Sequence, residues 1–238
     1  WQRSDWPIFR WDELELSKAE KLQIRFTGMM SMCGFDMRLK TELETSTREA
    51  IATSLIEGVV LDRASIRSSI ARRLGLEEYV TRMSEDRSIE GLAQILLEVT
   101  HNYDQPLTSD WLFRWHHMLF PSGRSGGVLI DVGKYRSGEI QIVSGPYSYT
   151  FSDDKSIRKI HYVGPPPDRV EMEMSRFFDW FTTTPDSIVK AAIAHLWFVQ
   201  IHPFDDGNGR ISRAIVELVL ARHDLSKRRF YSISNQIN

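Results

Sequence analysis

The sequence contains a single cysteine, Cys33, among its 238 residues. One cysteine can form neither an intramolecular disulfide nor a thiolate metal cluster, so a reducing environment is expected. No apolar run approaches the roughly 18–20 residues that a membrane-spanning helix needs, and no signal peptide is visible. These absences argue against a disulfide-stabilised secreted domain and a membrane protein, and they predict a cytoplasmic location.

An excess of charge is also missing. The chain has 30 Lys and Arg against 32 Asp and Glu, a net charge of −2, which argues against a general nucleic-acid-binding protein. The glycine- and serine-rich loop at 122–127 lacks the Gly-x-x-x-x-Gly-Lys-Ser/Thr spacing of a Walker P-loop. With 42% hydrophobic residues the chain can form a substantial core, and its length fits one sizeable domain or a large and a small one.

Apolar residues at helical spacing predict a mainly α protein. An aromatic arm is expected first. Helices are then expected at 12–45, 46–57, 62–75 and 89–103, and a further helix should begin after a cap at 107–110. The last three expected helices lie at 169–181, from about 185 to 201, and at 211–220. A β pattern between 134 and 163 predicts one small hairpin, with alternation at Glu139, Ile140, Gln141, Ile142 and Val143. Because the chain starts at Trp1 and stops at Asn238 amid expected structure, we anticipate more protein on at least the C-terminal side.

The most informative stretch runs from His202 to Arg213, between two apolar helical segments. Its glycines let the backbone turn tightly and expose amide groups, and the following helix adds a partial positive charge at its N-terminus. Arg210 and Arg213 oppose the helix dipole there, which an anionic ligand would explain. Asp206 is a hard oxygen donor suited to Mg²⁺, and His202 can take a proton near neutral pH. The stretch therefore predicts a site for a polyphosphate.

The other histidines carry less information. His116 and His117 are adjacent, so they face different sides of a helix and cannot form a metal-binding pair; we predict surface and packing roles. His195 and His202 lie two helical turns apart, but further plausible metal ligands are missing, which disfavours a metalloenzyme built on them.

The stretch at 202–213 resembles the signature of the Fic family, His-x-Phe-x-Asp/Glu-Gly-Asn-Gly-Arg-x-x-Arg, at every defined position. The segment 133–136, the hairpin and the segment 163–167 are similar to the flap region of the Fic core. The Trp-rich start is similar to an N-terminal module of some bacterial Fic proteins. The resemblance implies a Fic-type helical bundle with a small β-hairpin flap, divided into an N-terminal aromatic arm and helical module (1–45), a helical extension with an inhibitory helix (46–100) and the core (101–238).

The resemblance further implies transfer of AMP from ATP, with Mg²⁺, to a Tyr, Thr or Ser hydroxyl of a target protein or of the chain itself. His202 would be the general base, Asp206 would hold the metal, and Phe204 would anchor the loop. The hairpin residues Glu139, Ile140, Gln141, Ile142 and Val143 would dock the target segment. Contacts with ATP are implied for Asp205, Gly207, Asn208, Gly209, Arg210 and Arg213. Gly209 is informative because relatives that transfer phosphate carry Lys there.

A second resemblance lies far upstream. Residues 53–58 fit the family's inhibitory motif, Ser/Thr-x-x-x-Glu-Gly/Asn, with Thr53 and Glu57 at its defined positions. A carboxylate in the last helical turn opposes the helix dipole, so Glu57 alone is oddly placed. The resemblance implies that Glu57 pairs with Arg213 and denies that arginine to the γ-phosphate.

Two alternatives stay open. The first is a deAMPylase or bifunctional enzyme, in which Glu57 positions a water molecule; incubation with an AMPylated target without ATP would discriminate. The second is a non-catalytic regulator that senses ATP or ADP, which a turnover assay would identify. Neither nucleic acid nor a membrane is an expected partner, and a homodimer is compatible with the resemblance.

Overall fold

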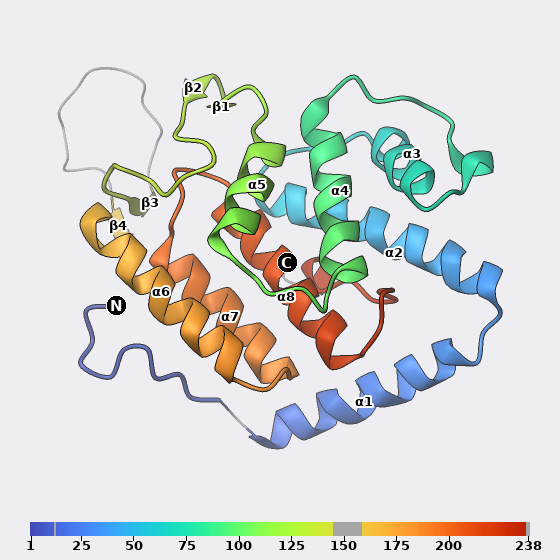
Figure 1. Cartoon of the computed structure of the whole chain (residues 1–238), viewed down its shortest axis with the longest axis horizontal. Helices are drawn as coiled ribbons and strands as arrows, with labels where there is room; N and C mark the ends of the chain where they lie inside the picture. Colours follow the sequence, from blue (N-terminus) through green and yellow to red (C-terminus); the bar gives the residue numbers. More distant parts are fainter. Residues whose placement is uncertain (12, 145–158, 237–238) are drawn as a thin grey trace.

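The computed structural model describes residues 1–11, 13–144 and 159–236, and helices dominate it. The mainly α prediction is confirmed (Figure 1). None of the helices in the described ranges is long and apolar enough to cross a bilayer. The α-helices are α1 (Glu13–Ser31), α2 (Phe35–Ile56), α3 (Arg63–Arg73), α4 (Arg87–His101), α5 (Ser109–Leu119), α6 (Pro167–Thr183), α7 (Ile188–Ile201) and α8 (Asn208–His223), with short 3-10 helices η1 (Glu77–Tyr79) and η3 (Ser234–Gln236).

Helices α7 and α8 form the centre of the bundle. They pack on each other, with α4 and α5 against α8 and α6 against α7 (Figure 1). Phe177 of α6, Phe198 of α7 and Trp115 of α5 are fully buried in this core. Phe204, in the connection between α7 and α8, is also fully buried, so the expected anchoring of that connection is confirmed. The core thus fixes both ends of the α7–α8 loop.

The predicted boundary between the first two helices is wrong. The helical conformation is interrupted at 32–34 and not near residue 45, because Gly34 adopts an extended conformation as the N-cap of α2. Ser46 and Thr47, which suggested a helix start, lie buried inside α2, where the Thr47 hydroxyl donates to the Leu43 carbonyl at 2.6 Å. A hydroxyl that bonds back to the preceding turn is satisfied within a helix. The expected division of the chain at residue 45 therefore falls within α2.

The predicted hairpin is present. Strands β3 (Gln141–Ser144) and β4 (Lys159–Val163) pair antiparallel, with Ile142 opposite Tyr162. Part of the expected β stretch lies at 145–158, outside the described residues, and Glu139 and Ile140 precede β3. A second small pair, which the sequence did not indicate, has β1 (Arg124–Ser125) within the loop expected at 122–127 and β2 (Val128–Leu129) directly after it.

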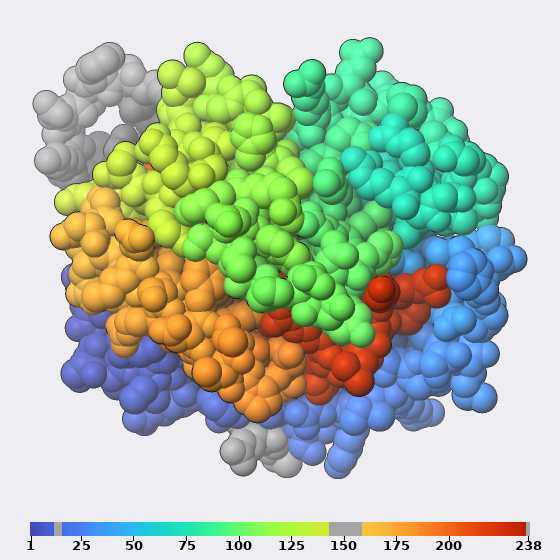
Figure 2. Space-filling view, viewed as in Figure 1, coloured from blue at the N-terminus to red at the C-terminus, as the bar shows by residue number. Residues whose placement is uncertain are grey.

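The aromatic N-terminal arm is packed on the bundle. The Trp6 ring meets the rings of Phe9 and Trp197 at centroid distances of 5.9 and 6.0 Å, and its Nε1 donates to Glu173 at 3.2 Å. Trp1 Nε1 donates to the Val163 carbonyl at 2.7 Å, so the arm also reaches β4. Figure 2 shows this N-terminal segment (blue) below α6 and α7 (orange).

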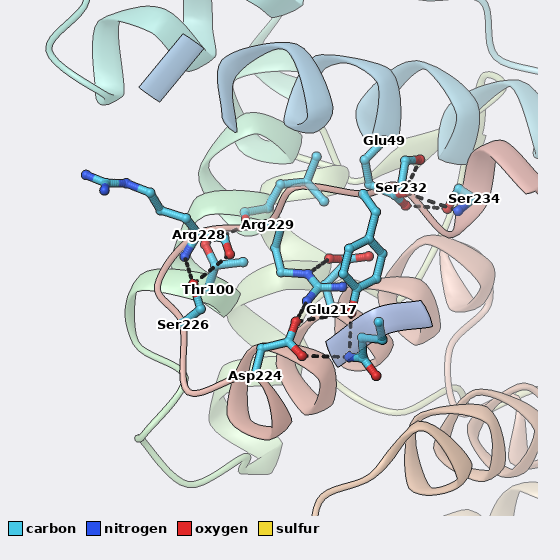
Figure 3. Close-up of polar contacts among 12 residues, drawn as sticks. Glu49, Thr100, Glu217, Asp224, Ser226, Arg228, Arg229, Ser232 and Ser234 are labelled. Carbon is cyan, nitrogen blue, oxygen red and sulfur yellow. Dashed lines mark hydrogen bonds and ion pairs between the residues drawn. The ribbon is translucent and has the colours of Figure 1, made fainter. Parts of the chain in front are cut away.

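Residues 226–236, here called the C-terminal segment, join α2 to α8 through buried polar contacts (Figure 3). Arg229 donates to Glu217 and Asp224 at 2.7 and 2.6 Å. On the other side, Glu49 of α2 accepts from the Ser232 hydroxyl at 2.7 Å and from the Ser234 amide at 3.1 Å. Buried charges require such partners, because an unpaired one would be costly. The segment therefore supports α2 along the face that leads to Glu57.

Gly91 of α4 allows α4 and α5 to pack closely, and Gly28 of α1 provides a matched comparison. A Cβ atom on Gly91 would lie 2.1 Å from the Met118 carbonyl oxygen, whereas one on Gly28 would meet nothing within 4 Å. We expect Gly91→Ala to lower the free energy of unfolding by about 1–3 kcal/mol through overpacking. Gly28→Ala should raise it by up to about 1 kcal/mol, because alanine favours helices. Urea unfolding measures both; a stabilised Gly91→Ala variant would contradict the close packing.

Candidate active site

The loop between α7 and α8 has an unusual backbone that its own side chains support. His202 caps α7 in the left-handed region with φ 52°, and Gly207 caps the start of α8 with φ 79°. A Cβ atom on Gly207 would lie 2.8 Å from Phe120, so this position requires glycine. The Asn208 side chain accepts from the Phe204 amide at 2.9 Å and donates to the Phe204 carbonyl at 2.7 Å. The loop is therefore held in one shape without a ligand.

His202 has the hydrogen-bonding arrangement of a base. Its Nδ1 lies 3.1 Å from the Val199 carbonyl oxygen, which can only accept a hydrogen bond, so the proton resides on Nδ1. Nε2 is then unprotonated and available to accept. Burial lowers the pKa of His202 below its usual value, and the nearby Arg136 acts in the same direction. The imidazole is therefore neutral at neutral pH and can take up a proton through Nε2.

Asp206 is the carboxylate that could hold a metal. Its Oδ1 accepts from the Gly207 amide at 2.5 Å, and its Oδ2 accepts from the Ser125 hydroxyl. Among the described residues, no group of three or more His, Cys, Asp or Glu side chains could hold a metal ion by itself. Mg²⁺ commonly binds through one or two carboxylates together with phosphate oxygens and water. A single carboxylate beside the amino end of a helix therefore fits Mg²⁺ that arrives together with an anionic ligand.

A cavity of about 700 Å³ borders Asp206 and extends toward α2 and α4. Arg210 of α8 lines it and stacks on Phe120, with 4.9 Å between the guanidinium carbon and the ring centroid. Arg210 Nε is buried and has no hydrogen-bond partner. The amino end of α8, where backbone N–H groups have no helical partner, lies beside these residues and favours an anion. The cavity can accept negatively charged groups.

Arg213 faces α2 and is nearly fully buried. Its Nε donates to the Thr53 hydroxyl at 2.6 Å, and its Nη2 donates to the Thr53 carbonyl at 2.9 Å and to Glu57 Oε1 at 2.6 Å. A Cβ atom on Gly209 would lie only 1.9 Å from Glu57 Oε1, so the Glu57 carboxylate lies directly over the Gly209 backbone. Thr53, Glu57 and Arg213, which the sequence placed together, are in contact.

Several further side chains differ from expectation or were missed. Asp205 accepts from the Asp131 amide at 2.9 Å, so its carboxylate holds a neighbouring loop; its contact with ATP stays a prediction. The surface and packing roles predicted for the two adjacent histidines divide between them: His117 is exposed, whereas His116 is fully buried and contacts the Asp206 carbonyl. Arg136, the last residue of the segment 133–136, is buried and donates to the carbonyls of His202 and Pro165 at 2.7 and 2.6 Å, a role that the sequence did not predict. The signal in the sequence that could have pointed to this residue is its place directly after Gly-Lys-Tyr.

The hairpin adjoins the loop through Arg136 and β4. The Gly164 amide donates to the Ile140 carbonyl at 3.0 Å, and the Tyr162 hydroxyl donates to the Gln200 carbonyl at 2.5 Å. Ile142 and Ile160 are exposed on the strands. The hairpin is thus attached to the end of α7 while keeping apolar side chains in solvent, and target docking by Glu139–Val143 stays a prediction.

Two family models match the chain. The Fic/DOC family model matches residues 106–220, which include α5 to α7, the hairpin, the loop and α8 as far as residue 220. A domain of unknown function, DUF4172, matches residues 1–76, which include α1 to α3. Glu57 and Arg213 therefore lie in segments that two different family models match.

Curated relatives and a solved structure are also similar to the chain. The chain is 29% identical over 218 residues to the protein adenylyltransferase Fic of Nematostella vectensis, covering 88% of this chain and 46% of that protein. It is 30% identical over 134 residues to the uridine 5'-monophosphate transferase of Xanthomonas campestris, covering 50% of this chain and 22% of that protein. A Fic domain containing signalling protein from Bacteroides thetaiotaomicron shares the fold, with a TM-score of 0.62 at 17% identity over 85% of this chain and 72% of that one. The chain thus spans less than half the length of these curated relatives.

The burial of His202, in the loop, and of His116, in α5, leads to a titration prediction. Burial lowers the pKa of His116 to about 4 and moves the pKa of His202 below 6.5. Both should therefore take up a proton at a lower pH than a free imidazole does. Imidazole nitrogen shifts in ¹⁵N NMR measure this, with His116→Gln and His202→Ala variants to assign the signals. A pKa at or above 6.5 for either residue would contradict the burial of its ring.

Proposed function

Because the chain is a Fic family protein with its Fic/DOC domain at residues 106–220, we propose that it transfers AMP from ATP to a hydroxyl group of a target protein or of itself. The observation that carries the proposal is the joint placement of a neutral histidine, a carboxylate and an arginine around the amino end of α8. Nucleotidyl transfer depends mainly on positioning and on stabilising phosphate charge, and this loop supplies both.

The proposed transfer proceeds in one displacement at the α-phosphorus. The target hydroxyl oxygen forms a bond to this phosphorus while the bond to the oxygen bridging the α- and β-phosphates breaks. The hydroxyl proton moves to Nε2 of His202, while the proton on Nδ1 stays hydrogen-bonded to the Val199 carbonyl. Pyrophosphate leaves with the bridging oxygen, and the AMP is left as a phosphodiester on the target. General base assistance of this kind contributes a rate factor of about 10²–10⁴.

The phosphate charge would be stabilised by groups that the loop already holds in place. The amides at the start of α8, from Gly207 to Gly209, would contact the phosphates, and Arg210 would add a positive charge from the cavity wall. Mg²⁺ held by Asp206 would neutralise phosphate charge when bound. The preset loop means that little reorganisation is needed as charge develops.

The same geometry supports restraint by α2. Arg213 is the remaining cation of the motif, and Thr53 and Glu57 occupy its donors. The Glu57 carboxylate also covers Gly209, where phosphate oxygens would approach the backbone. An anion and Glu57 cannot share this space, since like charges repel. We therefore assign Glu57 the role of an inhibitor in cis that keeps ATP from binding productively.

Release of Glu57 should activate transfer. We expect Glu57→Gly to increase AMP incorporation about tenfold or more, because a hydrogen bond to a charged group contributes about 1.5 kcal/mol or more. Glu57→Gln, which keeps an acceptor without charge, should give a smaller increase. Labelled ATP with Mg²⁺, followed by intact mass and peptide mapping, measures the gain of AMP. Glu78→Gln, on the exposed η1, is the matched control. No increase in Glu57→Gly would contradict the restraint.

The role of His202 is tested in the Glu57→Gly background. His202→Ala should reduce transfer by about 10²-fold or more while nucleotide affinity changes little. Titration calorimetry with ATP and rates of AMP transfer separate the two effects. Parallel assays with UTP, and with an AMPylated target in the absence of ATP, distinguish uridylyl transfer and deAMPylation. Unchanged transfer in His202→Ala would remove His202 from its role as the base.

A further inference from the structure

His116 of α5 has no part in the proposed chemistry, yet it contacts the residue that would hold the metal. Its Nε2 lies 3.1 Å from the backbone carbonyl oxygen of Asp206, and the ring is fully buried. The imidazole stacks on Phe204, with 4.3 Å between centroids and 14° between ring planes. The His116 ring is therefore held against the loop both by stacking and by a hydrogen bond.

The proton on this imidazole can be located from its partners. The Gly133 amide can only donate, and it points to Nδ1 of His116 at 3.3 Å, so Nδ1 carries no proton. The proton must then be on Nε2, which donates to the Asp206 carbonyl, a group that can only accept. His116 thus bridges the turn at Gly133 and the loop at Asp206 through one fixed tautomer.

We propose that His116 is a positioning residue that sets the direction of the Asp206 carboxylate by fixing the peptide unit of Asp206. The peptide is held from α5 by His116, while the carboxylate is held by Ser125 and the Gly207 amide. One contact to the peptide unit and two to the carboxylate thus orient the Asp206 side chain at the edge of the cavity that Arg210 lines. This inference rests on the proposed function, in which Asp206 receives Mg²⁺ with the nucleotide.

The effect should appear in metal dependence and not in nucleotide binding itself. Supporting groups behind a metal ligand typically contribute a factor of about 10–100 to metal affinity. His116→Gln keeps a donor amide near the Nε2 position, whereas His116→Asn can reach only the Nδ1 position. His117→Gln changes the exposed neighbour on α5 and is the matched control.

The test uses the full chain in the Glu57→Gly background and titration calorimetry with ADP, in Mg²⁺ and in EDTA. We expect His116→Asn to weaken the Mg²⁺-dependent part of ADP affinity about tenfold, with the affinity in EDTA changed by less than about twofold. His116→Gln and His117→Gln should stay within about twofold of the parent. Equal losses in Mg²⁺ and EDTA, or no loss in His116→Asn, would overturn the proposal. Whether the parent transfers AMP is read separately, so failure of the proposed function is distinguishable.

A second measurement needs no substitution that could unfold the protein. Nitrogen shifts of His116 in long-range ¹H–¹⁵N NMR report which ring nitrogen carries the proton. We expect protonated Nε2 and unprotonated Nδ1, and a change in the Nε2 shift when ADP and Mg²⁺ are added together but not with ADP in EDTA. The opposite tautomer would overturn the proposal, since Nε2 could not then donate to Asp206.

Discussion

The arrangement of this molecule depends on a buried positive charge. Arg213 is nearly fully buried in α8, and such a charge is tolerated only when its donors are satisfied. Thr53 and Glu57 supply oxygens from a helix about 160 residues earlier in the chain. The position of α2 over the loop is thus coupled to the charges at the amino end of α8. An arriving polyphosphate would offer Arg213 a different set of oxygens.

The support behind the cradle is assembled from short segments distant in sequence. Asn208 braces Phe204 within the loop, Arg136 holds the carbonyl of His202, and Asp205 holds the loop at Asp131. These contacts are made by side chains of the chain itself, so they define the shape of the loop from within the fold. Preorganisation of this kind reduces the reorganisation that a developing negative charge would otherwise require.

Much of the fold and the core of the site could be predicted from sequence, and particular residues explain the rest. Helical spacing located most helices, but it misplaced the first break because Ser46 and Thr47 look like a helix start while lying inside α2. The resemblance placed Glu57 beside Arg213 correctly. It could not reveal His116 behind Asp206, because adjacency to His117 says nothing about which ring is buried. Contacts between α5 and the loop arise only when the chain has folded.

The buried face of α2 has a thermodynamic consequence. Its ten buried residues include only three apolar ones, Leu43, Ala50 and Ala52; the others are glutamate, threonine or serine. On hydration, apolar and polar surface change heat capacity with opposite signs, so withdrawal of this face would produce a small net change. The equilibrium between attached and detached α2 should therefore vary little in enthalpy with temperature.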